Sequence, residues 1–161
     1  MCAQLALIVK DSQLESLDLS NNCISDPVEL LKCCMRPNTT HAEEDAQPHH
    51  YLTYLDISRN DIREPGCLSL MRAIKQEDFG LKSLVIDGNQ ICDGFVLILN
   101  SVLQTSLKYF NKDLSVLSMA ECGIVIKEEH EHVIAKIFGD TGITRLNLSG
   151  NVFERGLSAA Q

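Results

Sequence analysis

The side chains best suited to metal binding or acid–base chemistry lie together in residues 128–132, which read Glu-Glu-His-Glu-His. Imidazole and carboxylate groups are zinc ligands, and on a helix such ligands are best placed three or four residues apart. His130 and His132 are two residues apart, which on a helix places them on different faces. The remaining histidines lie in the polar residues 41–50, and metal binding is not expected there either. We therefore expect no metal site and no cofactor.

The seven cysteines give no recognisable site either, because no Cys-x-x-Cys pair occurs. The adjacent Cys33 and Cys34 lie on or near an apolar stripe, where buried thiols are the ordinary outcome. No glycine-rich phosphate loop is present, and no Ser-His-Asp or Cys-His arrangement can be argued from the spacing. We therefore expect the chain not to be an enzyme, and its free thiols favour a cytoplasmic location.

Net charge limits the classes of partner. The chain carries 14 basic and 22 acidic residues, which gives a formal net charge of -8. A negative chain repels phosphate backbones and anionic lipid surfaces, so we expect neither nucleic-acid nor membrane binding. Residues 3–9 are apolar but too short for a membrane span, and no basic stretch precedes them as in a signal peptide. The acidity serves solubility, and it also favours another protein with a basic surface as partner.

An internal repeat accounts for most of the chain. Residues 14–24 have the form L-x-x-L-x-L-x-x-N-x-I, with fixed positions at Leu14, Leu17, Leu19, Asn22 and Ile24. The same form returns at four further sets of residues: Leu52, Leu55, Ile57, Asn60 and Ile62; Leu81, Leu84, Ile86, Asn89 and Ile91; Leu114, Leu117, Met119, Cys122 and Ile124; Ile143, Leu146, Leu148, Asn151 and residues 152–153. Five copies of a five-point pattern are a strong signal of a repeat architecture.

The copies start near residues 14, 52, 81, 114 and 143, at spacings of 38, 29, 33 and 29 residues. The two longer spacings indicate insertions, a polar one at residues 36–50 and another around residues 105–113. We expect residues 1–13 to be the helix of an incomplete preceding repeat and residues 14–161 to hold five repeats, the last one truncated. Further repeats or neighbouring subunits are expected to cover both ends, because solenoids need their terminal core covered.

Each copy predicts a short strand followed by a helix. Alternate residues of a strand point to one face, so Leu17 and Leu19 point inward while Ser16, Asp18 and Ser20 point outward. Residues 26–29 read as a helix N-terminus with Asp26 as its N-cap. Apolar residues at helical spacing follow each strand, and the expected stripes are Leu30, Leu31 and Cys34; Leu68, Met71 and Ile74; Val96, Leu99, Val102 and Leu103; and, in a helix over residues 128–138, Val133, Ile134 and Ile137.

These repeats resemble the ribonuclease-inhibitor-like class of leucine-rich-repeat proteins over nearly all of residues 14–156. The resemblance implies an α/β solenoid, a horseshoe arc with parallel β-strands on the concave face and α-helices on the convex face. It also implies that the asparagine at the ninth position of a repeat bonds backbone groups of its own and neighbouring turns, with Cys122 an accepted alternative. The same class occurs in innate-immune receptors, the Ran GTPase-activating protein and the tropomodulins.

The outward strand positions are the expected partner-binding site on the concave face: Ser16, Asp18, Tyr54, Asp56, Ser58, Ser83, Val85, Asp87, Val116, Ser118, Arg145 and Asn147. The three aspartates form an acidic strip beside Tyr54, the only aromatic residue in the set, which suits a Lys- or Arg-bearing partner. The alternative is that these polar residues only keep the face soluble. Residues 36–50 are a second candidate site, although their composition favours a mobile loop.

The sequence thus favours a non-catalytic protein–protein interaction module, such as a scaffold subunit of a larger assembly. Two alternatives rest on fold resemblance alone: a regulator of a GTPase, like the Ran activator, and a sensor module of a larger receptor.

Overall fold

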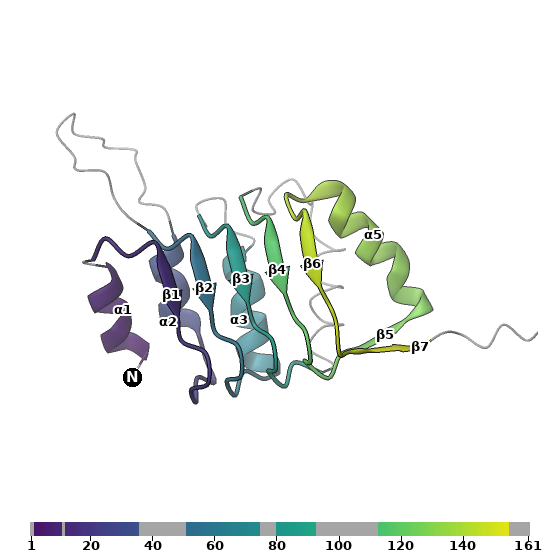
Figure 1. The fold of residues 1–161 in the computed structure, drawn as a ribbon, viewed down its shortest axis with the longest axis horizontal. Helices are drawn as coiled ribbons and strands as arrows, with labels where there is room; N and C mark the ends of the chain where they lie inside the picture. Colours follow the sequence, from purple (N-terminus) through teal and green to yellow (C-terminus); the bar gives the residue numbers. More distant parts are fainter. Residues whose placement is uncertain (1, 11, 36–50, 75–79, 93–112, 155–161) are drawn as a thin grey trace, which may run out of the picture.

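The computed structural model describes residues 2–10, 12–35, 51–74, 80–92 and 113–154 (Figure 1). In chain order the elements are α1 (Cys2–Lys10), β1 (Ser16–Asp18), α2 (Val28–Leu31), the 3-10 helix η1 (Lys32–Cys34), β2 (Tyr54–Asp56), α3 (Glu64–Ile74), β3 (Ser83–Val85), β4 (Val116–Ser118), β5 (Val125–Lys127), the 3-10 helix η4 (Glu128–His130), α5 (Glu131–Asp140), β6 (Arg145–Asn147) and β7 (Val152–Glu154). The second insertion and the helix expected at residues 94–103 lie almost wholly outside the described residues, and residues 36–50 lie wholly outside them.

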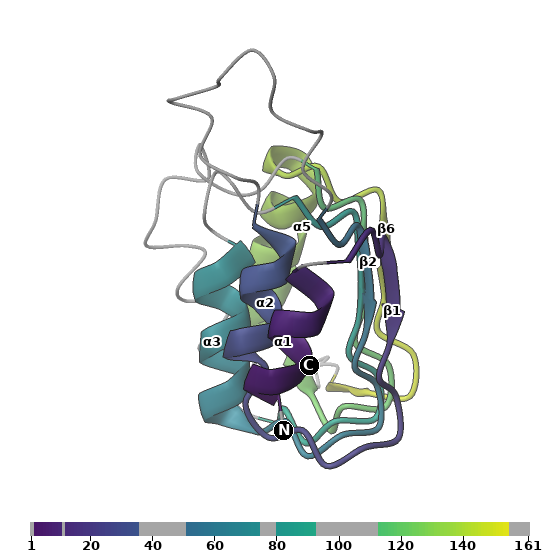
Figure 2. The ribbon, with the colours of Figure 1, turned by 90° about the vertical axis from the view of Figure 1, so that its left-hand side faces the viewer.

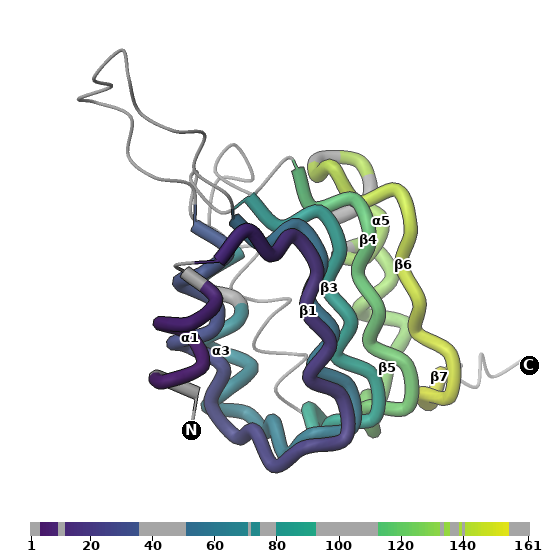
Figure 3. The backbone as a smooth tube through the Cα atoms, turned by 60° about the vertical axis from the view of Figure 1, so that its left-hand side comes forward, coloured from purple at the N-terminus to yellow at the C-terminus, as the bar shows by residue number. Residues whose placement is uncertain are grey.

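Five strands form one parallel sheet in the order β1-β2-β3-β4-β6, and Figure 3 shows them as successive rungs of a stack. The register places the middle leucine of each strand beside that of the next: Leu17, Leu55, Leu84, Leu117 and Leu146. Because side chains alternate along a strand, this register directs all five leucines to the same face. The predicted parallel alignment of the repeats is confirmed.

The helices form a second layer on one side of this sheet, and the core lies between the two layers (Figure 2). The core is mainly aliphatic. Residues of the helical segments, among them Leu30, Cys34 and Leu70, are buried in it together with these repeat positions: Leu52, Leu55, Ile57, Ile62, Leu81, Leu84, Ile91, Leu114 and Ile124. Leu17, Leu117 and Leu146 are only half-buried, and the first and last of them lie on the two outer strands of the sheet. The predicted α/β leucine-rich-repeat architecture is confirmed.

Two helices differ in detail from the expected pattern. In α3 the fully buried positions are Cys67, Leu70 and Ile74, whereas the predicted Leu68 is only half-buried. The helix begins at Glu64, and the side that faces the core carries Cys67 and Leu70 in place of Leu68. The helix after Ile24 is short and continues as η1. Its N-cap is Pro27, so the predicted N-cap at Asp26 is wrong by one residue, although Asp26 Oδ1 accepts the N–H of Val28 at 3.0 Å.

The fourth repeat contains a strand that the sequence pattern does not predict. The chain forms β5 before η4 and α5, and β5 pairs in parallel with β7 in a second, two-stranded sheet. Ile126 of β5 is buried, whereas Phe153 of β7, which takes the last apolar position of the fifth copy, is 59% exposed. The expected helical segment does begin at residue 128, as the 3-10 helix η4 followed by α5. No described element packs over β7, so Phe153 is exposed.

Asparagine side chains tie each repeat to the preceding one. Asn60 Nδ2 donates to the carbonyl oxygens of Leu19 in the preceding repeat and Ile57 in its own, at 3.0 and 2.9 Å. Asn60 Oδ1 accepts the N–H of Ile24, again in the preceding repeat, at 3.0 Å. Asn89 makes the same three contacts one repeat later. Buried backbone groups that would otherwise lack partners are thereby satisfied across the repeat boundary.

Cys122 takes the asparagine place in the fourth repeat. Its thiol donates to Ile86 O of the preceding repeat at 3.4 Å, which replaces the amide with a weaker donor. Asn151 restores the pattern, donating to Met119 O at 2.7 Å and accepting from the N–H groups of Cys122 and Ile124 at 3.0 Å each. We call this series of side chains, Asn60, Asn89, Cys122 and Asn151, the asparagine ladder, and it connects each described repeat to the one before it. At Cys122 the ladder lacks an acceptor, because a thiol takes the place of the amide oxygen.

The residue before each ladder position has a left-handed backbone, with φ between 51° and 70°: Asn21, Arg59, Gly88, Glu121 and Gly150. The first four donate their N–H groups to carbonyl oxygens of the next repeat. A left-handed conformation costs a residue with a Cβ about 1–2 kcal/mol. Arg59 and Glu121 adopt it nonetheless, so the turn is imposed by bonding between repeats and not by local preference.

Candidate protein-binding surface

The sheet face opposite the helices is left uncovered by every described element, as Figure 2 shows beyond β1, β2 and β6. We call it the outer sheet face, and it comprises the predicted site residues Ser16, Asp18, Tyr54, Asp56, Ser58, Ser83, Val85, Asp87, Val116, Ser118, Arg145 and Asn147. The strand register arranges ten of them in two rows across the sheet: Ser16, Tyr54, Ser83, Val116 and Arg145, and then Asp18, Asp56, Val85, Ser118 and Asn147. Parallel pairing therefore brings together residues that are distant in the sequence.

Asp18 and Asp56 are direct neighbours in the second row, and Tyr54 lies two residues from Asp56 on the same face. Burial, the charges of Asp56, Asp18 and Asp87 and a hydrogen bond with Asp56 all raise the pKa of the Tyr54 hydroxyl. Tyr54 therefore stays a neutral phenol with an aromatic face among three carboxylates.

Short turns hold the two neighbouring carboxylates in place. Asp18 Oδ1 accepts the N–H of Ser20, and Asp56 Oδ1 accepts the N–H of Ser58, both at 2.8 Å. The backbone N–H and the hydroxyl of Ser20 lower the pKa of Asp18, so this carboxylate stays ionised. Sequence reasoning missed these anchoring serines, although the repeated Asp-x-Ser spacing is their signal. The turns therefore fix the orientation of both aspartates on the outer sheet face.

Asp87 departs from the expected strip. It lies two residues beyond Val85, which is the register neighbour of Asp56, so it is diagonal to Asp56 and two strands away from Asp18. Its Oδ1 accepts from the Ser118 hydroxyl at 2.6 Å and from Ala120 N at 2.7 Å. Asp87 therefore joins β3 to β4, in addition to contributing negative charge.

Ser118 does not belong to an accessible binding surface. It is 7% exposed, and its hydroxyl donates to Asp87 while accepting from Asn147 Nδ2 at 3.0 Å. The sequence pattern predicts an outward position but not this burial, because the small side chain is enclosed by larger neighbours on both adjacent strands. The other site residues of β3 and β4, Ser83, Val85 and Val116, stay partly accessible, so Ser118 is a buried position within an otherwise accessible face.

Charge is distributed unevenly along the outer sheet face. Asp18 and Asp56 are at the β1–β2 end, and Arg145 is exposed on β6 at the other end. Ser83, Val85 and Val116 lie between these ends and carry no charge.

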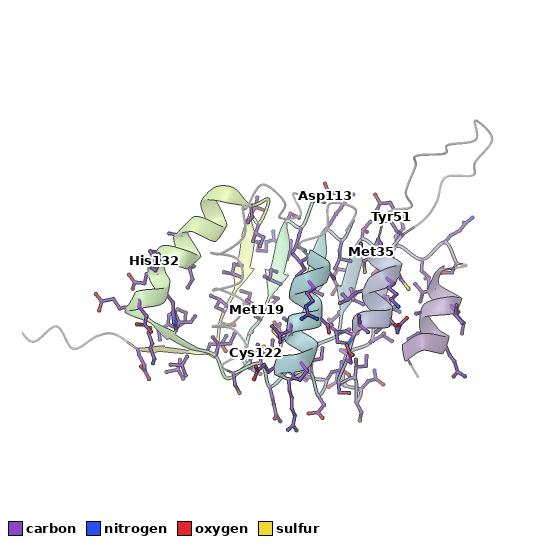
Figure 4. The ribbon with its side chains drawn as sticks, turned by 180° about the vertical axis from the view of Figure 1, so that it is seen from behind. Met35, Tyr51, Asp113, Met119, Cys122 and His132 are labelled. Atoms are coloured by element: carbon purple, nitrogen blue, oxygen red, sulfur yellow. The ribbon has the colours of Figure 1, made fainter. Side chains whose placement is uncertain are left out.

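The other chemically active side chains do not converge on this face. His130 is buried and its Nδ1 accepts the N–H of Lys127 at 3.1 Å, which caps the helical segment, whereas His132 is exposed on α5 (Figure 4). Burial raises the pKa of Cys67 to about 12 and that of Cys122 to about 11. Within the described residues, no group of three or more His, Cys, Asp or Glu side chains is placed to hold a metal ion.

Comparison with known proteins agrees with this geometry. A family model described as Leucine Rich repeat matches residues 11–27 and 49–71, the segments around β1 and β2. The solved structure of leiomodin-1 actin-binding site 2 is similar, with a TM-score of 0.62 and 17% sequence identity, over 96% of this chain and 80% of that one. The chain has the leucine-rich-repeat fold. No curated protein sequence matches it significantly.

The leucine-rich-repeat comparisons fix the fold and leave the ribonuclease-inhibitor-like subclass a prediction. None of the helices within the described ranges is long and apolar enough to span a membrane.

Proposed function

We propose that this leucine-rich-repeat chain is a non-catalytic protein-interaction module whose outer sheet face binds a lysine- or arginine-bearing segment of another protein. The observation that carries the proposal is the placement of Asp18 and Asp56 side by side in register, with the Tyr54 ring on the same face. A scaffold role in a larger cytoplasmic assembly and the ribonuclease-inhibitor-like subclass are part of the same proposal.

The chemistry of the three residues is complementary to a cationic side chain. An exposed ion pair alone contributes roughly 0–1 kcal/mol. The Tyr54 ring supplies apolar contact area and a π face for a cation, which contributes a further ~0.5–1 kcal/mol at an exposed site. Asp18 and Asp56 are already oriented by Ser20 and Ser58, so little side-chain freedom is lost on binding.

A direct test uses labelled peptides of equal length that are rich in Lys and Arg or in Asp and Glu, with binding followed by fluorescence anisotropy. We expect the basic peptides to bind and the acidic ones not to bind. Asp18→Asn with Asp56→Asn removes both charges and keeps the oxygen that accepts from each serine. This double variant should weaken binding about tenfold or more, equivalent to ~1.4 kcal/mol.

The matched control is Asp61→Asn with Glu128→Gln, which removes the same charge from exposed residues away from the outer sheet face. We expect this control to bind like the unmodified chain. Equal weakening by the two double variants would show that only net charge matters and would refute a site at Tyr54. Actin, the ligand named for the leiomodin-1 site, is a defined protein to test in the same way by co-sedimentation.

A further inference from the structure

Groups of opposite charge lie at a fixed separation on the outer sheet face. Tyr54 and Asp56 are on β2 and Arg145 is on β6, with β3 and β4 between these strands in the sheet (Figure 1). Neighbouring strands are about 4.8 Å apart, so three strand steps separate the two sites by about 14 Å. These positions are on the face of the sheet, so a further strand beside β1 or β6 would not cover them.

Arg145 is available for an ion pair with a ligand. The residue is exposed, and among the described residues its side chain makes no hydrogen bond or ion pair. Its register neighbour on β4 is the uncharged Val116. A guanidinium group binds a carboxylate through two parallel hydrogen bonds. Arg145 is therefore suited to an aspartate or glutamate side chain of a partner.

The part of the outer sheet face between the two charged sites is apolar. Val85 of β3 and Val116 of β4 are diagonal neighbours, because Ser83 is the residue that pairs with Val116. Both valines are half-buried, so each keeps part of its surface accessible. Contact with an aliphatic side chain would remove this apolar surface from water, which is favourable.

The spacing of these three sites matches that of an extended chain laid across the strands. An extended segment rises about 3.4 Å per residue, so four residues span about 14 Å, the separation of β2 and β6. Alternate side chains point to the same side, so the first, third and fifth residues of such a segment face the sheet together. The third residue lies about 7 Å from β2, between β3 and β4, where the two valines are.

From this match we infer that the partner segment is extended, crosses the strands and carries two opposite charges four residues apart. Its lysine or arginine lies over Tyr54 and Asp56, and its aspartate or glutamate pairs with Arg145. An aliphatic residue midway between them contacts Val85 and Val116. The inference rests on the proposed function and adds to it the second charge, the apolar contact and their spacing.

The net charge of the chain makes the role of the acidic residue distinctive. The chain carries a formal charge of -8, so an acidic residue added to a ligand should weaken binding through overall repulsion. It can strengthen binding where it meets a cation directly. A gain in affinity from a negative charge, at one position of the ligand, is therefore specific evidence for Arg145.

The test compares short labelled peptides by fluorescence anisotropy. Each contains one lysine and a valine two positions from it, and the fourth position from the lysine is glutamate in one peptide and glutamine in another. A third peptide has its glutamate at the third position, where it faces away from the sheet. Every peptide is made in both chain directions. We expect glutamate at the fourth position to bind about fivefold more tightly than glutamine in one direction, the upper range for one exposed ion pair. Glutamate at the third position should give no gain.

Charge reversal on the protein assigns the gain to one residue. Arg145→Glu should abolish the advantage of glutamate and should favour a peptide with lysine at the fourth position. Arg72→Glu is the matched control, because Arg72 is an exposed residue of α3 in the helical layer and the change in charge is the same. This control should keep the advantage of glutamate, once circular dichroism shows that both variants are folded.

Two results would overturn the inference. One is equal binding of the glutamate and glutamine peptides in both chain directions, and the other is a gain from glutamate that survives Arg145→Glu. If the lysine peptides bind and glutamate adds nothing, the proposed function stands and this inference fails. If no lysine peptide binds, both fail.

Discussion

The Asn89 side chain donates to the carbonyl oxygen of Ile57 in the preceding repeat at a distance of 3.0 Å. Its Oδ1 simultaneously accepts the N–H of Ile62 at 3.1 Å, and the residue is 2% exposed. One side chain thereby satisfies buried backbone groups on both sides of a repeat boundary. The outer sheet face depends on such bonds, since they fix how each strand follows the one before it.

Replacing Asn89 with alanine should therefore destabilise the chain. The change leaves the buried Ile62 N–H without its acceptor, at about 1–3 kcal/mol. It also removes one of the donors to Ile57 O and to Ile86 O, which keep Asn60 Nδ2 and Cys122 Sγ respectively. We expect the free energy of unfolding to fall by about 2 kcal/mol or more in urea titrations. Asn22→Ala is the control, because Asn22 is exposed and bonds only its own turn, and it should cost much less. Equal losses from the two variants would contradict the structural role of the ladder.

Cys122→Asn should stabilise the chain, because an amide at this position can both donate to Ile86 O and accept the N–H of Ile91, as Asn60 does with Ile24. A gain of about 1 kcal/mol is the size of one net hydrogen bond. Cys34→Asn is the contrasting variant, since Cys34 is fully buried outside the ladder, and it should be destabilising. Thermal unfolding of both variants measures whether each substitution raises or lowers the stability of the chain. A lower stability of Cys122→Asn would count against the prediction.

Gly66 and Gly139 form a matched pair of helical glycines. A Cβ on Gly66 would lie 2.5 Å from the Ser25 carbonyl oxygen, whereas nothing lies within 4 Å of a Cβ on Gly139. Gly66→Ala should thus push α3 away from the preceding turn and cost about 1–3 kcal/mol. Gly139→Ala should be neutral or stabilising by up to about 1 kcal/mol, because alanine restricts the unfolded chain. Urea unfolding curves that rank the variants the other way would refute this packing.

The thiols should label in order of exposure. Cys23 and Cys92 are exposed, whereas Cys33, Cys34, Cys67 and Cys122 are buried. Iodoacetamide reacts with the thiolate, so mass spectrometry after labelling near pH 8 should find the first two modified and the others protected until unfolding. Modification of Cys67 or Cys122 in the folded protein at this pH would be the contradicting result.

The raised thiol pKa values also predict a loss of stability at high pH. The pKa rises from 9.0 to about 12 for Cys67 and to about 11 for Cys122 on burial. Below pH 9 both the folded and unfolded chains keep these thiols protonated, so the contribution is fully present. Above pH 9 only the unfolded chain releases the protons, and the stability falls as pH rises through the folded values. Unfolding curves of Cys67→Ala should show a smaller fall over this range.

The spacing of the leucines predicts most of the fold, because leucines at alternate positions of a repeat indicate a strand with one buried face. Leu17 and Leu55 could be aligned from sequence, since an in-register parallel stack is the arrangement that buries both. Strand β5 could not be predicted in this way, because Val125 and Ile126 come just before an expected helix and the pairing that stabilises them is supplied by β7.

The candidate site was predictable in composition but not in detail. Alternation along the strand places Asp18 and Tyr54 on the outer sheet face without a structure. It does not reveal that Asp87 accepts from Ser118 and Ala120 of the next strand, because that depends on how neighbouring side chains fill the space between strands. Bonding across a repeat boundary is a property of the stack and is absent from any single repeat.

The most direct test of the central claim is a nuclear magnetic resonance titration of the isotope-labelled chain with a basic peptide that binds it. We expect the largest amide shifts at Asp18, Tyr54 and Asp56, with little change in the exposed residues of α3. Shifts confined to the helices, with β1 and β2 unchanged, would contradict the assignment of the outer sheet face as the binding surface.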